Sequence, residues 1–247
     1  MVTFTKYSKM ADVIHKDYRL ISILARFDIK LGFGNQSVDE ICRTQGIDVG
    51  FFLEIINSYH NPNYFPENQL RNFKAHLVIG YLSNTHAYYL NSKIPQIEKC
   101  IQKMERGATE KNSRNIGLLR HFFQEYKAEI EEHFGAEEEH IFPYILSLEK
   151  AMKDGDCNNE LIERIRIEPI EIYERNHDNL EVKLSDMKNL IIRFLPPVSE
   201  ELCERLLIEL FRMESDLENH ARIEEKVLVP KVKLLETKVL ETYGMYL

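Results

Sequence analysis

The sequence predicts an all-α protein: a small helical domain over residues 1–62, followed by an up-down-up-down four-helix bundle over residues 70–245. Apolar residues recur every three or four positions through most of the chain, as they do on one face of a helix. Glycine and proline are sparse, with ten and eight in 247 residues, and several prolines fall between the periodic segments. The clearest break, Asn61-Pro-Asn-Tyr-Phe-Pro66, separates short periodic segments from long ones and marks the predicted domain boundary.

The region before this break contains three short periodic segments, at about residues 9–30, 37–45 and 48–59. The second segment opens with Ser37-Val-Asp-Glu40, which resembles a capping box. In that motif a serine side chain and a glutamate three residues later each accept a hydrogen bond from the other residue's backbone. We therefore expect a small helical domain in this region.

Four longer periodic segments follow, and each carries a histidine among the apolar residues of its helical face. These faces extend over residues 79–94, 119–144, 170–194 and 206–227. Polar or proline-containing stretches at residues 106–115, 154–159 and 195–197 separate the segments. Because short connections make consecutive helices antiparallel, the four segments predict an up-down-up-down bundle.

The composition excludes several classes of protein. A net charge of −8 argues against a nucleic-acid-binding protein, which commonly carries a basic patch. The sequence has neither an apolar signal-peptide core near its start nor a run of 18 apolar residues, so no membrane association is expected. The four cysteines have no CxxC spacing, which favours reduced thiols over a disulfide framework. We therefore expect a cytoplasmic protein.

Two stretches that lie 87 residues apart share one motif, at residues 133–143 and 220–230. Each reads H-x3-E-E and has a proline ten residues after the histidine. Residues four apart in a helix lie on the same face, one turn from each other. His133 with Glu137, and His220 with Glu224, therefore each present an imidazole and a carboxylate in one direction.

The motif belongs to a longer repeat that predicts a metal centre. His86 precedes His133 by 47 residues, and His177 precedes His220 by 43, so a helix with one histidine precedes each motif helix. Buried carboxylates without a cation would cost on the order of tens of kcal/mol by ideal solvation estimates. We therefore predict a dinuclear site that is bridged by the two glutamates. Mixed imidazole and carboxylate ligands favour iron, with manganese and zinc as alternatives. The predicted ligands are His86, His133, Glu137, His177, His220 and Glu224.

Other residues near these motifs are predicted to have structural roles or to face solvent. Glu138 and Glu225 are rotated by about 100° from the ligand positions, one residue's step in a helix, and should therefore be solvated. The tyrosines of the apolar faces are predicted to belong to the core, although a tyrosine can also hydrogen-bond to a metal ligand: Tyr89, Tyr126 and Tyr173.

With these residues in place, the chain resembles a known family. The four long segments are similar to the hemerythrin-like di-iron domain, and residues 9–60 are similar to the small N-terminal domain of the repair-of-iron-centres (ScdA/YtfE-like) proteins. The second similarity rests on Asp12-Val-Ile14, Leu24-Ala-Arg-Phe-Asp-Ile29 and Ser37-Val-Asp-Glu-Ile-Cys42. The resemblance implies a non-haem centre of two iron ions held by the six predicted ligands. It also implies damaged iron–sulfur proteins as iron acceptors, and O2 or NO as small ligands.

The sequence departs from the family pattern at two places. The family has adjacent cysteines where this chain has Leu31 and Gly32, so a redox or metal-transfer role of that thiol pair is not implied here. A further family histidine would fall near Thr109, and no histidine lies between residues 86 and 121. We expect either an oxygen ligand from Glu105 or Glu110, or a water molecule, in the place of this histidine. An open coordination position would suit the binding of O2 or NO.

The leading hypothesis is a non-haem di-iron protein of the iron–sulfur-cluster repair type, which binds or donates iron in the response to nitrosative and oxidative stress. This role is that of a metal-binding or repair protein rather than a turnover enzyme. The alternative is a hemerythrin-like protein that binds or senses O2 or NO, and the missing cysteine pair favours it. A redox enzyme that reduces NO or peroxide is a third reading. Association into a homodimer is left open by the sequence.

Overall fold

The computed structural model describes residues 3–110, 112–176, 180–194 and 199–244. Within these ranges the regular elements are helices, apart from an isolated bridge between Lys9 and Ser37. The predicted all-α class is therefore confirmed. None of the helices in the described part of the chain combines the length and the apolar character needed to cross a membrane.

The first four helices form a compact group at the N-terminal end of the chain. They are α1 (Met10–Lys16), α2 (Leu20–Arg26), α3 (Val38–Gln45) and α4 (Val49–His60). The last two match the predicted segments at 37–45 and 48–59, whereas the segment predicted at 9–30 consists of two helices. The division falls at the buried Asp17, whose carboxylate accepts a hydrogen bond from the backbone N–H of Arg19 at 3.1 Å. This local side-chain contact stabilises a turn that helical periodicity alone does not reveal.

Hydrogen bonds between side chains and backbone hold this group together. The capping box is present: the N–H of Glu40 donates to Ser37 Oγ at 3.3 Å, and the N–H of Ser37 donates to Glu40 Oε2 at 2.7 Å. Asn57 of α4 exchanges two hydrogen bonds with the backbone of Phe4, at 2.8 and 3.0 Å. The start of the chain is thereby fixed to α4.

The rest of the described structure is also helical and includes three long helices that each continue through a five-residue π-helical turn. In these turns η1 (Tyr89–Lys93) joins α6 to α7, η2 (Glu137–Ile141) joins α8 to α9, and η3 (Glu224–Leu228) joins α13 to α14. The flanking helices are α5 (Glu67–Asn72), α6 (Ala75–Tyr88), α7 (Ile94–Arg106), α8 (Ser113–Ala136), α9 (Phe142–Asp154), α10 (Asn159–Ile167), α11 (Ile170–Asn176), α12 (Leu180–Phe194), α13 (Glu200–Ile223) and α14 (Val229–Tyr243). Helix α10 fills a stretch for which the sequence predicted no element. The predicted connection at 195–197 lies outside the described residues.

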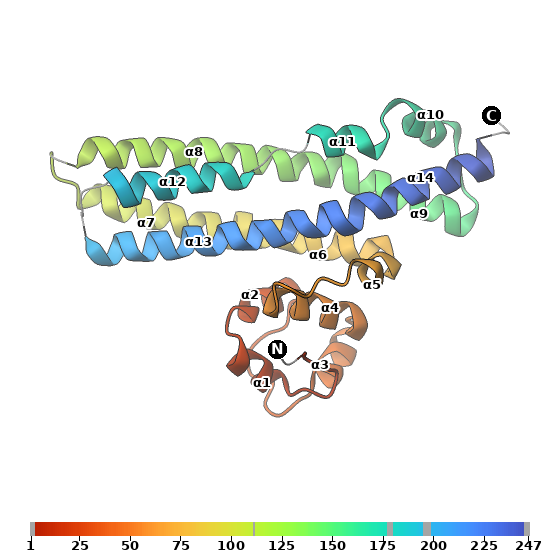
Figure 1. Ribbon diagram of the computed structural model, residues 1–247, viewed down its shortest axis with the longest axis horizontal. Coiled ribbons are helices and arrows are strands. Elements are labelled where there is room, and N and C mark those ends of the chain that lie inside the picture. Colours follow the sequence, from red (N-terminus) through yellow and green to blue (C-terminus); the bar gives the residue numbers. More distant parts are fainter. Residues whose placement is uncertain (1–2, 111, 177–179, 195–198, 245–247) are drawn as a thin grey trace.

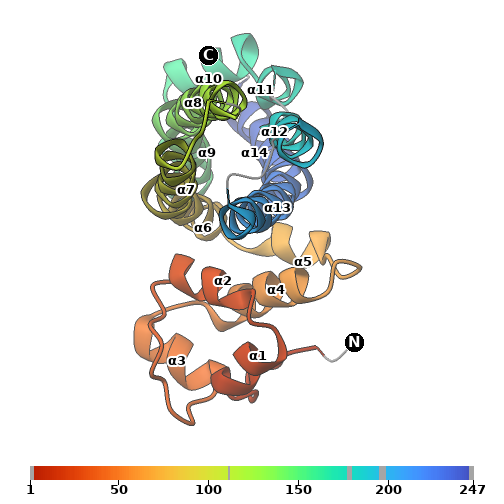
Figure 2. The same cartoon turned by 90° about the vertical axis from the view of Figure 1, so that its left-hand side faces the viewer.

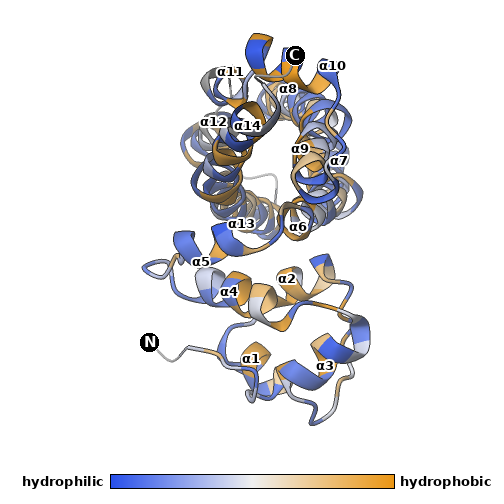
Figure 3. Ribbon diagram, turned by 90° about the vertical axis from the view of Figure 1, so that its right-hand side faces the viewer, coloured by the Kyte–Doolittle hydropathy of each residue, from blue (hydrophilic) through white to orange (hydrophobic). Residues whose placement is uncertain are grey.

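The long helices pack side by side around a common core. Helix α7 contacts α8 and α13, and α12 contacts the same two helices, which closes a ring (Figure 2). Hydrophobic and hydrophilic residues alternate along these helices, as expected when one face is buried (Figure 3). The buried face of this part includes Leu119, Phe123, Ile130, Leu210 and Met213.

The N-terminal helices lie against one side of the long helices (Figure 1). Helix α2 contacts α6, and α5 contacts η3. The apolar core continues across this boundary, because Leu24 and Phe52 belong to the same buried cluster as Leu82 and Val227. The N-terminal group therefore rests on the two long helices that carry His86 and His220.

Candidate metal centre

The three π-helical turns all occupy the same place relative to a proline. Each turn begins six residues before it: η1 before Pro95, η2 before Pro143 and η3 before Pro230. The N–H of Ile94, Phe142 and Val229 each donates to the carbonyl five residues earlier. A proline inside a helix has no N–H, and its ring clashes with the carbonyl four residues before it. The extra residue of the π turn displaces that carbonyl, so the spacing to proline accounts for the position of each turn.

This arrangement places five of the six predicted ligands at or just before the π turns. Glu137 and Glu224 are the first residues of η2 and η3, and His133 and His220 lie one turn before them. His86 lies three residues before η1. Single π turns inside α-helices frequently occur at functional sites, where they change the direction of side chains.

Four of the predicted ligands meet in the interior of the protein. His86, Glu137, His220 and Glu224 each place one ligand atom so that the four atoms lie within 4.8 Å of one another. His86 Nε2 is 3.2 Å from both Glu137 Oε2 and His220 Nε2, and His220 Nε2 is 2.7 Å from Glu224 Oε1. None of the four residues is more than 3% exposed.

The chemistry of this cluster fits a cation. Glu137 Oε2 is buried and lies 3.2 Å from His86 Nε2, which in turn lies 3.2 Å from His220 Nε2. Two carboxylates so deeply buried repel each other and have lost their hydration, which is costly unless positive charge compensates them. The lone pairs of two imidazole nitrogens and the two carboxylates converge on one small volume. A metal ion bound there would satisfy these groups together.

His86 is oriented by a carboxylate that was predicted to face solvent. Its Nδ1–H donates to Glu138 Oε1 at 2.8 Å, and Glu138 also accepts from Ser83 Oγ at 3.0 Å. A metal-binding histidine commonly donates its second ring N–H to a carboxylate, which fixes the ring and leaves the other nitrogen for the metal. Glu138 is exposed, as predicted, with a side chain that is 40% accessible, and in addition it orients His86. His86 comes from a different helix, α6, and its two ring nitrogens therefore contact both glutamates: Nε2 faces Glu137 and Nδ1 faces Glu138.

These hydrogen bonds also change the proton affinity of His86. Burial alone would lower its pKa, but the hydrogen bonds to Glu137 and Glu138 outweigh burial and raise the pKa to about 9. The hydrogen bond from His86 conversely lowers the pKa of Glu138. In the metal-free protein, a proton on His86 therefore supplies part of the positive charge that the cluster requires.

Of the two remaining predicted ligands, His133 lies at the edge of this cluster. His133 Nε2 lies 3.6 Å from Glu137 Oε1, and its side chain is 12% exposed. The same oxygen of Glu137 accepts a hydrogen bond from the hydroxyl of Tyr173 in α11. Burial, followed by the charges of Glu224 and Glu137, raises the pKa of Tyr173, so the hydroxyl stays protonated and donates. His177 lies outside the described residues.

The two glutamates expected to replace the missing family histidine do not reach the cluster. Glu105 is 19 residues from His86 along the continuous α6–η1–α7 helix, a distance of about 28 Å at 1.5 Å per residue. It pairs instead with Arg120 of α8 at 3.1 Å. Glu110 is exposed and follows the end of α7. Glu105 and Glu110 therefore do not take the place of the missing histidine, which leaves water as the third group that the sequence suggested for this coordination position.

The sequence did not predict that Glu138 contacts a ligand, and for Tyr173 it offered such a contact only as the secondary possibility. The doubled glutamate of the H-x3-E-E motif was a signal for the first, because a side chain next to a ligand can reach a ligand on an adjacent helix. Tyr173 was predicted to be a core residue. Its position four residues before His177 gave no evidence that its hydroxyl reaches Glu137.

The fold and the buried imidazole–carboxylate cluster define an all-helical, cation-binding class of protein. The hemerythrin HHE cation binding domain matches residues 89–232, more than half of the chain, and the protein belongs to this family. His86 lies three residues before the matched range. The chain is also similar to the iron–sulfur cluster repair protein ScdA of Staphylococcus haemolyticus (strain JCSC1435). The two are 22% identical over 202 residues, which cover 80% of this chain and 85% of that protein.

Proposed function

We propose that this protein holds two iron ions and supplies iron for the repair of iron–sulfur clusters under nitrosative or oxidative stress. In this proposal Glu137 and Glu224 bridge the ions. Histidines from four helical segments complete the ligand set: His86, His133, His177 and His220. The similarity to an iron–sulfur cluster repair protein supports the role, and the HHE domain supports a bound cation. The acceptors would be damaged iron–sulfur proteins.

One observation carries the proposal: two buried carboxylates and two buried imidazoles bring ligand atoms within 4.8 Å of one another. When bound, iron would neutralise this cluster and provide a store of ferrous ion. His86 and His220 would bind through Nε2, since Nδ1 of His86 already donates to Glu138. Glu137 has His86 on one side and His133 on the other, which is the placement a bridging carboxylate needs.

The ligand set also suits a protein that releases its metal. Oxygen and imidazole ligands bind ferrous ion less tightly than a thiolate cage does. Where the repair family has paired cysteines, this chain has the exposed Leu31 and Gly32. Cys42 is buried, and burial, together with the nearby charges of Asp39 and Asp48, raises its pKa to about 12. A neutral thiol is a poor metal ligand at neutral pH, so we assign iron handling to the bundle ligands.

We further propose a two-domain organisation, with residues 1–62 as the N-terminal helical domain and residues 70–245 as a hemerythrin-like four-helix bundle. The loop at residues 61–66 supports this boundary, since α4 ends at His60 and α5 begins at Glu67. In this arrangement the long helices provide the ligands. The N-terminal helices cover one side of the ligand-bearing α6 and α13.

The second candidate function is the binding or sensing of O2 or NO. It is favoured by the absence of the cysteine pair and by the failure of Glu105 and Glu110 to replace the missing histidine. A coordination position filled by water could exchange with a small ligand. The two functions differ in whether iron leaves the protein.

Iron transfer distinguishes these functions. The iron-loaded full-length protein is incubated anaerobically with an apo iron–sulfur acceptor, sulfide and a reductant, and the two proteins are then separated and analysed for iron. For the repair role we expect iron to move to the acceptor as its cluster absorbance develops, while the Glu137→Ala variant delivers none. Retention of iron by the wild-type protein, with a spectrum that changes on exposure to NO or O2, would instead support binding or sensing.

A further inference from the structure

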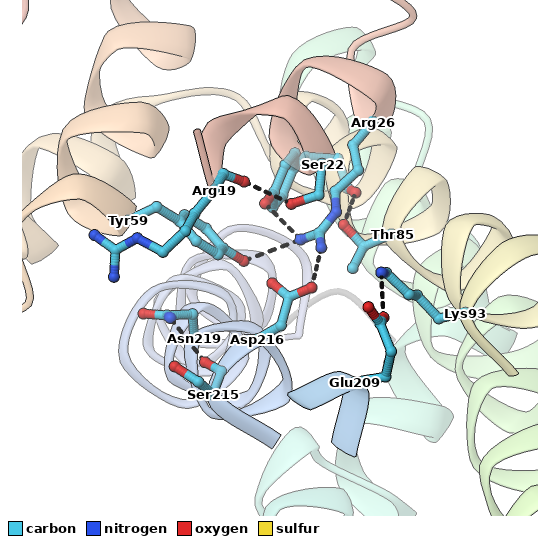
Figure 4. Close-up of polar contacts among 11 residues, drawn as sticks. Arg19, Ser22, Arg26, Tyr59, Thr85, Lys93, Glu209, Ser215, Asp216 and Asn219 are labelled. Atoms are coloured by element: carbon cyan, nitrogen blue, oxygen red, sulfur yellow. Dashed lines mark hydrogen bonds and ion pairs between the residues drawn. The ribbon is translucent and has the colours of Figure 1, made fainter. Parts of the chain in front are cut away.

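An arginine from the N-terminal helices enters the interface with the long helices. Arg26, the last residue of α2, has a fully buried side chain. Its guanidinium forms an ion pair with Asp216 of α13 and donates to the hydroxyls of Tyr59 at 3.1 Å and Tyr81 at 3.2 Å. Figure 4 shows the guanidinium between Tyr59 and Asp216. A charged group buried to this degree is stable only when its partners are in place.

The contacts of Arg26 connect the two helices that carry His86 and His220. On α6, the hydroxyl of Tyr81 accepts from the guanidinium, and Asn84 Nδ2 donates to the Arg26 carbonyl at 2.8 Å. On α13, Asp216 pairs with the guanidinium. His86 follows Asn84 by two residues, and His220 follows Asp216 by four, one helical turn.

Aromatic rings extend this connection to the ligands. The guanidinium lies 5.0 Å from the ring centroid of Tyr88 and 5.5 Å from that of Tyr89. Tyr89 is completely buried, and its ring centroid is 6.2 Å from that of His220. It also stacks at 5.9 Å on Phe134, which in turn stacks at 4.0 Å on His86. Packed rings leave little free volume, so a shift at one end changes the space available at the other.

The electrostatics of Arg26 favour a permanent contact. Burial alone would lower its pKa, but the charge of Asp216 and the surrounding tyrosines outweigh burial and raise the pKa above the ordinary value. The guanidinium therefore remains charged throughout the physiological pH range. Removing either member of the pair would leave the other buried and uncompensated, which loosens the packing of α2 on α6 and α13.

We propose that Arg26 is a positioning residue of the metal centre. By holding α6 to α13, it sets the separation of His86 and His220, whose Nε2 atoms lie 3.2 Å apart. The N-terminal helices thus contribute to metal affinity without supplying a ligand, and their release from the bundle weakens metal binding. This inference rests on the proposed metal-binding role of the two histidines.

The test uses cobalt(II) as the probe, in the full-length protein, because its visible ligand-field bands report the geometry of its ligands. Arg26→Gln and Asp216→Asn are each expected to weaken cobalt binding at least tenfold and to shift these bands. Arg26→Lys, which keeps the charge, should restore part of the affinity. If a single variant does not fold, the double variant Arg26→Gln/Asp216→Asn removes both charges together, and the same loss of affinity is expected.

Lys188→Gln is the matched control. Lys188 is also buried and forms an ion pair with Glu214 of α13, but it belongs to α12, which packs against α8 and α13. Its substitution should leave the affinity within twofold and the spectrum unchanged. Wild-type affinity and bands in folded Arg26→Gln, or equal losses in Lys188→Gln, would overturn the positioning role alone. A wild-type protein that binds neither cobalt nor iron would overturn the proposed function and this inference with it.

Discussion

At the scale of single residues, the proposed metal centre depends on hydrogen bonds to its predicted ligands as well as on those ligands themselves. His86 illustrates this, because one ring nitrogen faces the cluster while the other donates to Glu138 at 2.8 Å. The hydroxyl of Tyr173 plays a similar part for Glu137. Both contacts come from helices other than those of the groups they orient, so neither follows from spacing along one helix.

Replacing Glu138 with alanine should weaken metal binding about 10- to 100-fold, the usual cost of losing a carboxylate that orients a metal-binding histidine. The substitution removes the acceptor of the His86 Nδ1–H and, with it, the hydrogen bond that orients the imidazole. Competition titration with a chromogenic chelator measures the change. Glu225 holds the equivalent position in the second motif and is exposed, so Glu225→Ala is the control and should have little effect. Equal effects of the two substitutions would contradict the orienting role.

Metal affinity should rise with pH up to about 9. The pKa of His86 in the metal-free protein is raised to about 9, so the contribution of its proton to stability is complete below its ordinary value of 6.5 and is lost as the pH rises through 9. A metal ion must displace this proton, which gives about a tenfold gain in affinity per pH unit below that value. Calorimetric titrations at about pH 7 and 8, in buffers of different ionisation enthalpy, measure the affinity and the proton released. An affinity that does not change over this interval would contradict the account.

At the scale of elements, the π-helical turns determine where the ligands lie. Periodicity in the sequence correctly predicted the helical faces that carry His86, His133 and His220, because a face that packs against a core must repeat its apolar residues. The proline ten residues after each motif histidine is part of the repeat, but the apolar pattern does not predict the π turn that precedes it. A π turn is a local response to a missing N–H, and it leaves the apolar pattern on both sides of Pro143 and Pro230 almost unchanged.

Glu236 joins three elements near the C-terminal end of the bundle. It is buried in α14, accepts from the hydroxyl of Tyr144 in α9 at 2.6 Å, and accepts from the N–H of Ile170 at the start of α11 at 2.8 Å. Glu236→Ala should lower the free energy of unfolding by about 1–3 kcal/mol, because it leaves two buried donors without an acceptor. Glu174→Ala removes an exposed ion pair with Lys233 and should cost less than about 1 kcal/mol. Urea unfolding measures both, and equal losses would contradict the role of Glu236.

At the scale of the whole molecule, the sequence predicted the helical class and most of the segments, but not how the N-terminal helices meet the bundle. The shared core and the buried Arg26 are contacts between residues far apart in the chain, and a single sequence gives no periodic signal for them. The candidate ligands could be predicted because their histidines and glutamates recur at fixed spacings on the apolar faces of the helices. Glu138, Tyr173 and the contacts of Arg26 depend on packing between helices, which spacing does not specify.

The iron content of the full-length protein tests the central claim most directly. It should be measured by elemental analysis, with visible spectra, after aerobic and anaerobic purification. We expect about two iron ions per chain in the wild-type protein, and far less in Glu137→Ala and Glu224→Ala at unchanged helical content, because the proposed role of these carboxylates is to bridge the ions. One ion or none under both conditions, or wild-type loading in both variants, would contradict the assignment of a di-iron centre.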